Sequence, residues 1–461
     1  MLNKVWSLVV VLVLAACAQN SEFVRPALPV PKQLGAGEQP SAVDVAKTHW
    51  RAYFSDPQLQ ALIAIALDNN RDLRIAAARV LEARAQFGLA NADLGPTFNL
   101  TGAANVARTP SDLSGTGSAS TGKRFDLTAS TVSYEIDFWG RVANLTEAAR
   151  FSYLASEESR RSVYLSLVAD VAMSYYAWLQ MRELSALEQL TTAARRQSLS
   201  LIKNAKELGG ANDFEYQQAV ALLESAQSAL AGFDHQQTLA RNRLNFLLGN
   251  TSYELPAGVT LDAQVLEANI ASGLSSEVLL FRPDVMMAEQ RLLAAHANID
   301  AARAAFLPKV MLTAGMGLAS QGLLGLFSGG AWSFQPIISL PLFDGGRASA
   351  GLELAQARKV IAVAEYERAI QVAFREVADM LSARVSLSQQ VRSSKVTLQV
   401  QARRLEIAHG RFAAGASGYM DVLEAQRELV SAQQMATQLR RAQLESTVQL
   451  YKALGGGREG V

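Results

Sequence analysis

An internal duplication constrains this fold more than any other feature of the sequence. The segment 208–211 (Leu-Gly-Gly-Ala) recurs as 414–417 (Ala-Gly-Ala-Ser), offset by 206 residues (415 − 209), and Leu248-Gly249 recurs as Leu454-Gly455 at the same offset. Upstream, a helical pattern that ends at Pro96 recurs 212 residues later (308 − 96) and ends at Pro308. Chance similarity between alanine-rich helices does not explain repeated motifs in one order. The chain therefore contains two copies of one structural unit.

The first repeat spans residues 56–255, and we predict helices over 56–95 and 140–248 with strands over 98–106 and 125–136. Asp56-Pro57 is a favourable helix start, and Gly95-Pro96 is a stop signal. Apolar residues alternate through both strands. In the return strand the apolar phase switches between Ala129 and Val132, which predicts a β-bulge.

The second repeat, residues 282–455, predicts helices over 282–307, 344–414 and 419–454 and strands over 310–318 and 332–340. A linker, 256–281, joins the repeats, and a short tail, 456–461, follows. Residues 142–208 contain no proline or glycine. A helix of that length extends about 100 Å, far more than a compact globular domain needs. The returning helices carry a coiled-coil stripe rich in Ala, Gln and Ser, a pattern that fits a barrel of helices or an ordinary antiparallel coiled coil.

The N-terminus resembles the export signal of a bacterial lipoprotein. A short positive start and an apolar run of about ten residues precede Leu14-Ala15-Ala16-Cys17. We therefore predict a signal peptide over 1–16, a covalent lipid on Cys17 and a lipid-anchored extension over 17–55. An ordinary signal peptide with an incidental cysteine is the alternative.

The four predicted strands have the length that spans a bilayer, but four strands are too few to close a membrane barrel. Three copies would supply twelve. The predicted fold is therefore mainly α with membrane β: a trimeric twelve-stranded β-barrel continued by a long α-helical barrel. Two soluble hairpins that cap a helical bundle are the alternative.

Charge and composition argue against several other functions. The chain has 43 Lys and Arg against 42 Asp and Glu, so it lacks the basic excess that nucleic-acid binding requires. The four histidines are scattered without metal-ligand spacing. Asp344-Gly345-Gly346-Arg347 lacks the strand-to-helix fingerprint of a dinucleotide site. We expect no enzyme activity, no metal and no cofactor besides the lipid on Cys17.

A set of motifs that recurs in order along the chain resembles the TolC-like outer-membrane factors of tripartite efflux systems, in particular their NodT-like lipoprotein branch. The motifs are Trp50 to Leu59, Asn70-Arg71-Asp72-Leu73, Phe138-Trp139-Gly140-Arg141, Arg282-Pro283-Asp284-Val285, Phe343 to Arg347 and Asp421 to Gln426. The resemblance implies a homotrimer in the outer membrane whose helical barrel crosses the periplasm. Its implied partners are a periplasmic adaptor (membrane fusion) protein and an inner-membrane pump of the proton-driven RND type.

The predicted function is the outer-membrane channel of a tripartite efflux pump that exports drugs or other small solutes. Two alternatives stay open: the outer-membrane duct of a type I protein secretion system, and a lipid-anchored periplasmic coiled-coil scaffold without a pore. The strands that follow Pro96 and Pro308 favour a duct, because a scaffold has no need of them.

Two sets of candidate site residues follow. The hairpin tips, Leu208, Gly209, Gly210 and Ala211 with Ala414, Gly415, Ala416 and Ser417, match the family's adaptor-docking motifs, although glycines there can also be plain helix caps. Asp421 and Glu424 are one helical turn apart, and three copies would place six carboxylates around a periplasmic aperture.

The resemblance also assigns neighbours of these acids to the aperture. Phe412 occupies the position of a constraining tyrosine, and Ser417 replaces an arginine that holds some members shut. Arg427, one turn beyond Glu424, is a candidate for a substitute ion pair. The alternative for the two acids is stabilisation of a helix N-terminus through its dipole, worth about 0.3–1 kcal/mol each.

Overall fold

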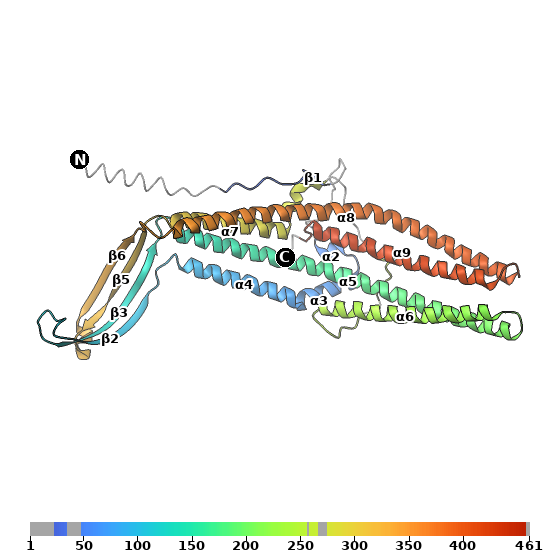
Figure 1. Cartoon of the computed structure of the whole chain (residues 1–461), viewed down its shortest axis with the longest axis horizontal. Helices are drawn as coiled ribbons and strands as arrows, with labels where there is room; N and C mark the ends of the chain where they lie inside the picture. The colour runs from blue at the N-terminus through green and yellow to red at the C-terminus, as the bar shows by residue number, and fades with distance from the viewer. Residues whose placement is uncertain (1–22, 35–47, 256–257, 266–273, 458–461) are drawn as a thin grey trace. The chain divides into compact units, whose positions relative to one another are not determined.

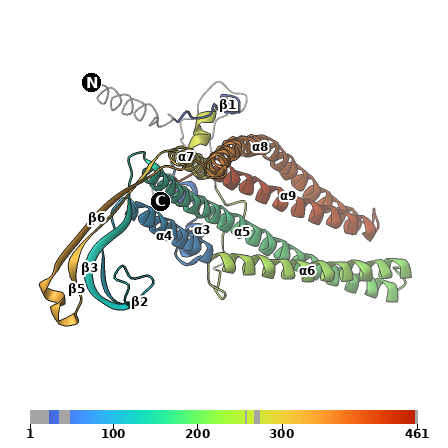
Figure 2. The ribbon, with the colours of Figure 1, turned by 60° about the vertical axis from the view of Figure 1, so that its left-hand side comes forward.

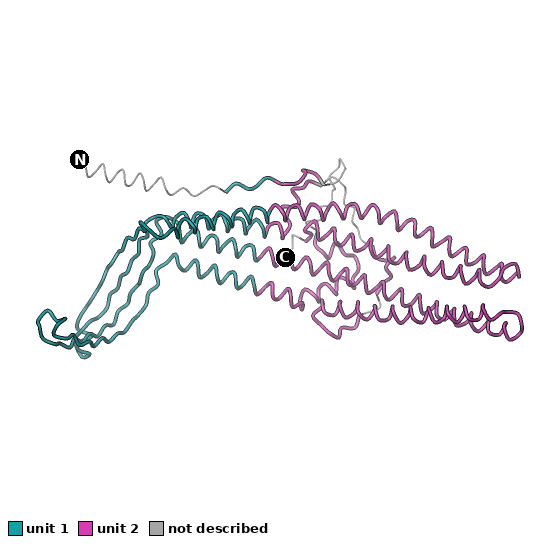
Figure 3. Tube along the Cα trace, viewed as in Figure 1, with its two compact units in different colours: residues 1–27, 79–156, 287–366 teal, residues 28–78, 157–286, 367–461 magenta. Residues whose placement is uncertain are grey.

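The computed structural model describes residues 23–34, 48–255, 258–265 and 274–457. Cys17 and the predicted signal peptide lie outside the described residues. The chain forms two compact units (Figure 3), and each draws segments from both sequence repeats. Unit 1 comprises residues 1–27, 79–156 and 287–366, and unit 2 comprises 28–78, 157–286 and 367–461. Of the helices in the described ranges, none is both long enough and apolar enough to cross a membrane.

Unit 1 contains a four-stranded antiparallel sheet in the order β2-β3-β5-β6 (Figure 1). The strands are β2 (Asn99–Thr109), β3 (Ser120–Ile136), β5 (Lys309–Ser320) and β6 (Gly330–Ser339), and each is somewhat longer than the sequence predicts. A short 3₁₀ helix, η2 (Leu323–Ser328), connects β5 to β6. The register between β3 and β5 shifts between Thr131 and Tyr134, which confirms the predicted bulge. Ser133, inside the bulge, has a positive φ of 53°.

The register gives the sheet two chemically different faces, because side chains alternate along each strand. We call one the apolar face: Leu100, Ala104 and Val106 of β2, Phe125, Leu127 and Ala129 of β3, Leu312, Met316 and Leu318 of β5, and Trp332, Phe334, Pro336 and Ile338 of β6. The other is the polar face: Asn99, Thr101 and Asn105, then Arg124, Asp126, Thr128 and Ser130, then Thr313, and finally Ser333, Gln335 and Ser339. Both faces have exceptions: the paired residues Met311 and Ile337 are apolar residues on the polar face, and Arg108, Lys123 and Ser320 are polar residues on the apolar face. Figure 2 shows that the sheet is strongly curved.

A long helix follows β3 and another follows β6, and an aspartate side chain caps the start of each helix. Before α5 (Arg141–Glu207), Asp137 accepts a hydrogen bond from the amide of Ala143 at 2.8 Å. Before α8 (Arg347–Ala413), Asp344 accepts from the amides of Gly346 and Ala348 at 2.9 and 2.7 Å. These carboxylates satisfy amides that have no partner inside the helix. The glycine-rich motif at 344–347 is therefore a strand-to-helix turn.

The helix predicted over 56–95 is in fact two helices, α3 (Pro57–Asn69) and α4 (Arg71–Ala92). Asn70 separates them with an extended backbone, at φ −62° and ψ 134°. Its side chain accepts from the amide of Leu73 and donates to the carbonyl of Leu247, at 3.0 Å each. Because this buried amide bonds both to the next helix and to a distant one, local helix propensity does not decide the break.

Unit 2 contains α3, the short helix α2 (Trp50–Tyr53) and two helical hairpins (Figure 1). The hairpins pair α5 with α6 (Asp213–Leu247) and α8 with α9 (Tyr419–Ala453). The span predicted as helix over 140–248 is therefore two helices, because the chain reverses at Gly209 and Gly210. The 3₁₀ helix η1 (Ser276–Phe281) forms the end of the predicted linker 256–281, and the helix α7 (Pro283–Ala304) follows it. The two-residue strands β1 (Gln33–Leu34) and β4 (Leu274–Ser275) pair antiparallel.

A buried polar centre around Asp56 joins the linker to the helices of unit 2. Asp56 caps α3, and its Oδ2 accepts from Tyr175 Oη at 2.9 Å and from Gln264 Nε2 at 2.7 Å. Burial raises the pKa of Tyr175 well above its ordinary value, with a further rise from the Asp56 carboxylate. Arg440 donates to the carbonyl of Gln264 at 2.6 Å. A polar group inside a core is tolerated when it is hydrogen-bonded, so this centre fixes the linker against α5 and α9.

Candidate functional site

The first hairpin tip is a closed helix cap. At the end of α5, the amide of Gly210 donates to the carbonyl of Ala205 at 2.7 Å, and Gly209 has a φ of +78°. This is the Schellman arrangement, which requires a left-handed residue and favours glycine. The next helix then begins with a capping box, in which the side chains of Asn212 and Glu215 each accept a hydrogen bond from the other residue's backbone N–H. Leu208 lies between the two helices and is 87% exposed.

The second tip repeats the cap but lacks the box. The amide of Ala416 donates to the carbonyl of Arg411 at 2.9 Å, and Gly415 has a φ of +71°. The N-cap of α9 is Gly418, which has no side chain to accept a hydrogen bond. A Cβ added at Gly209 or Gly415 would have no neighbouring atom within 4 Å in the part of the chain that the structure describes. Both tips are therefore helix caps with open space around their left-handed glycines.

Asp421 and Glu424 lie on the exposed side of α9, while Val422, Leu423 and Ala425 are buried on the other side. Within the described residues, no hydrogen bond or ion pair engages either carboxylate. Arg427 does not form the predicted pair with Glu424. It bonds instead to the adjacent Glu428, at 3.1 Å.

Aromatic packing holds the second tip together. The ring of Phe412 meets that of Tyr419 edge-on, with centroids 5.0 Å apart. Tyr419 also reaches α5, where its hydroxyl hydrogen-bonds to that of Ser198 at 2.5 Å. Ser417 is half-buried, and its hydroxyl has no partner within the described part of the chain. Phe412 therefore supports the shape of the tip from within its own chain.

An apolar cluster joins the two hairpins near their tips. Its buried members are Ile202 of α5, Ala219 of α6 and Leu423 of α9. Figure 1 shows both tips at the same end of unit 2. Because Leu423 lies between Asp421 and Glu424 in the chain, the packing of the two hairpins sets the position of both acids.

A buried charged stripe on α5 escaped the sequence analysis. Glu188, Thr192 and Arg195 fall on one face of the helix, and Glu188 and Arg195 are 4% and 5% exposed. Burial lowers the pKa of the Arg195 guanidinium and raises the pKa of the Glu188 carboxyl. Arg195 Nη1 has no hydrogen-bond partner among the described residues. The i, i+4, i+7 spacing of polar residues was the available signal.

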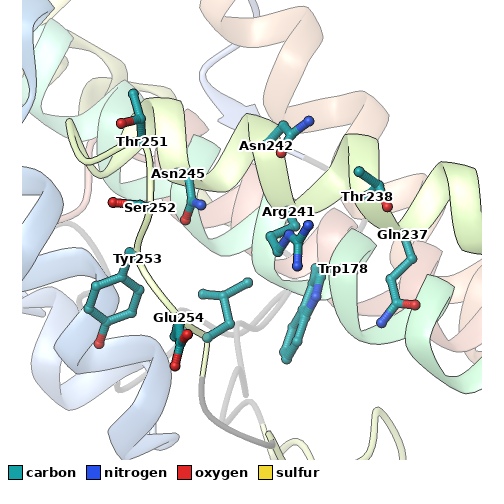
Figure 4. A pocket seen from close by; sticks show the side chains of 11 residues that line it. Trp178, Gln237, Thr238, Arg241, Asn242, Asn245, Thr251, Ser252, Tyr253 and Glu254 are labelled. Carbon is teal, nitrogen blue, oxygen red and sulfur yellow. The ribbon is translucent and has the colours of Figure 1, made fainter.

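A second feature of unit 2 is a polar cavity of about 530 Å³ (Figure 4). It is lined by Trp178 of α5, by Arg241 and Asn245 of α6, and by residues 251–255 after α6. Asn245 is buried, and its Oδ1 has no partner in the described structure. No motif in the sequence predicted this cavity, because its walls come from segments that only the fold brings together.

The profile of the family described as "Outer membrane efflux protein" matches residues 62–250 and 274–456. The chain belongs to this family. "Toluene efflux pump outer membrane protein TtgF" of Pseudomonas putida is 40% identical over 457 residues, which cover 96% of this chain and 95% of the relative. "Cation efflux system protein CusC" of Escherichia coli O157:H7 is 39% identical over 456 residues, 97% of each chain.

Solved structures of outer-membrane efflux channels have the same fold. The match to the crystal structure of CusC has a TM-score of 0.86 at 38% identity and covers 95% of this chain and 99% of that one. The match to the open state of the Neisseria gonorrhoeae MtrE outer membrane channel has a TM-score of 0.88 at 36% identity. It covers 96% of this chain and 98% of that one. The predicted fold class is confirmed. This family member is an outer-membrane channel component of an efflux pump, and its family consists of channel proteins, not of enzymes.

Proposed function

We propose that three copies of the chain assemble into a conduit that carries small solutes across the outer membrane. The supporting observation is the unit 1 sheet, which has an apolar face, a polar face and two unpaired edges, β2 and β6. Unpaired strand edges are not tolerated in lipid, so the sheet needs partners of its own kind. Three copies supply twelve strands, with the apolar faces toward lipid and the polar faces toward a water-filled lumen.

The helical hairpins are proposed to work in the periplasm. Their tips have exposed caps with open space at Gly209 and Gly415, which suits the approach of an adaptor's helices. Asp421 and Glu424, whose carboxylates have no hydrogen-bond or ion-pair partner among the described residues, are proposed to form the acidic aperture of the trimer. Phe412 is assigned a supporting position beside that aperture through its contact with Tyr419.

The remaining assignments extend the family's function to this chain. Cys17 is proposed to carry a covalent lipid that anchors the N-terminus in the outer membrane. The partners are proposed to be a periplasmic adaptor and an RND-type inner-membrane pump. Relatives are named for toluene and for cation efflux. A passive duct takes what its pump delivers, so we assign the cargo class as small solutes.

Conductance of the purified protein tests this function. Detergent-solubilised protein should cross-link as a three-chain species and give discrete conductance steps in a planar lipid bilayer, because a closed twelve-stranded barrel encloses water. A cross-linked trimer that never conducts would favour the pore-free periplasmic scaffold. A channel that supports secretion of a protein substrate but not solute efflux in cells would favour the type I secretion duct.

A further inference from the structure

The tip of the β5–β6 hairpin is unusually apolar for a loop. Leu323, Leu324 and Phe327 of η2 are 64%, 103% and 78% exposed. The other hairpin of the sheet differs, since residues 110–119 between β2 and β3 are mostly Ser, Gly and Thr. Three large apolar side chains exposed on one turn mark a contact with an apolar partner.

Local geometry places η2 on the apolar face of the sheet. Ser320, the last residue of β5, shares that face with Leu318 and Met316, because alternate residues of a strand point the same way. Its hydroxyl accepts from the amide of Gly322 at 3.2 Å and lies 2.8 Å from where a Cβ of Gly325 would be. η2 therefore folds back over the Ser320 side chain and contacts β5 and β3. It does not turn toward the polar face, where it would project into a lumen.

Two cations lie on the same face, Lys123 diagonally across from Ser320 and Arg108 one strand further from η2. Ser320 is paired with Phe125, and the next residue of β3 on the apolar face is Lys123. Lys123 is paired with Val106 of β2, and the next residue of β2 on that face is Arg108. Diagonal neighbours of this kind are about 7–8 Å apart. Both side chains are exposed, and neither makes an ion pair or hydrogen bond within the described residues.

We infer that η2, Lys123 and Arg108 form a binding surface for an anionic lipid of the outer leaflet, with acyl chains against Leu323, Leu324 and Phe327 and the headgroup phosphate against the two cations. The inference rests on the proposed function, in which the apolar face meets lipid. On β3 that face changes from Phe125 to Lys123, which is the change expected where a bilayer passes from hydrocarbon to headgroups. Arginine and lysine bind phosphate through charge-assisted hydrogen bonds.

A fluorescent label at the tip tests the apolar half of this surface. Leu324→Cys protein is labelled with bimane and reconstituted into vesicles of phosphatidylcholine and phosphatidylglycerol with brominated acyl chains. The matched control is Thr116→Cys in the other hairpin, and protein without an added cysteine gives the background from Cys17. The label at position 324 should be strongly quenched, and the label at 116 should not. Equal, weak quenching at both positions would overturn the inference.

Spin-labelled lipids test the cationic half. The protein should prefer phosphatidylglycerol to phosphatidylcholine at its surface, and Arg108→Gln with Lys123→Gln should remove most of that preference. Arg124→Gln is the matched control, because Arg124 is adjacent to Lys123 in β3 but lies on the polar face. There it forms an ion pair with Asp126. A preference unchanged in the double variant, or lost equally in Arg124→Gln, would refute the phosphate site.

Conductance of the same vesicles separates this inference from the proposed function. Vesicles that conduct while the label at 324 stays unquenched overturn the lipid surface alone. Vesicles that neither conduct nor quench the label overturn the conduit together with the lipid surface.

Discussion

Asp421 and Glu424 differ from their counterparts in the first repeat in ways that plain helix capping does not explain. The counterpart of Asp421 is Glu215, which is used inside the chain by its capping box. The counterpart of Glu424 is Gln218, whose Oε1 is buried. In the second repeat the N-cap is Gly418, and both carboxylates are exposed. Either acid can stabilise the N-terminus of α9 by about 0.3–1 kcal/mol through the helix dipole. That role alone does not explain why Glu424 is present in addition to Asp421.

Neutralising the two acids should change how the channel treats ions. Asp421→Ala with Glu424→Ala should lower cation selectivity and weaken block by multivalent cations added from the periplasmic side, because a ring of carboxylates attracts cations. Single-channel recording of reversal potentials in a salt gradient measures this effect. Glu428→Ala is the control, since Glu428 is one turn further along and already bonded to Arg427. Selectivity and block that stay as in the parent protein would remove both acids from the aperture.

At the scale of elements, the two tips combine a helix cap with an open surface. Gly209 and Gly415 hold left-handed backbone angles, which cost a residue with a Cβ about 1–2 kcal/mol. The strain falls on an exposed turn, while the apolar cluster around Ile202, Ala219 and Leu423 still joins the hairpins. A substitution at the tip should therefore affect contacts with other chains more than folding.

Gly415→Leu should abolish efflux in cells while the trimer still assembles, and Gly209→Leu should do the same. The bulky side chain fills the open space that an adaptor helix needs. Drug accumulation measures efflux, and cross-linking in the membrane measures assembly. Gly410→Leu is the control, because Gly410 lies in the last turn of α8, also has open space around it, and has no left-handed angle. Normal efflux in both tip variants would leave the glycines with a capping role only.

At the scale of the whole molecule, two anchoring devices are proposed, a lipid on Cys17 and the apolar face of the sheet. They are independent in the sequence, because the sheet begins more than eighty residues after Cys17. Each buried methylene of an acyl chain contributes about 0.8 kcal/mol to anchoring. A barrel that spans the bilayer is held there by its own apolar face, so the sheet is expected to keep the protein in the membrane without the lipid.

Cys17→Ser should block acylation but leave the protein in the outer membrane. Fractionation of cells after metabolic labelling with palmitate tests both points, since the label should disappear while the protein stays in the membrane fraction. Loss of the protein to the soluble periplasm would argue that lipid, not the sheet, holds it there. Palmitate labelling that persists in the variant would place the lipid on another residue.

Features that depend on short-range patterns could be predicted from the amino-acid sequence alone. Alternation of apolar residues located the strands and the bulge near Ser133, and runs without proline or glycine located α5 and α8. Both signals are carried by residues close together in the chain, so one sequence is enough to detect them. The paired tip motifs were found through the duplication, and the acids of α9 from their one-turn spacing and from the family resemblance.

Features that depend on residues far apart in the chain could not be predicted and follow from the folded structure. Asn70 separates two helices because it caps α4 locally and also bonds to Leu247, a residue far along the chain. The burial of Arg195 and the choice of Glu428 as the partner of Arg427 depend on packing and on side-chain conformation. Likewise, the apolar run at 323–327 was visible in the sequence, but the face on which it lies followed from the position of Ser320 in the sheet. Local propensity contributes about 1 kcal/mol or less per residue, so a buried long-range contact overrides it.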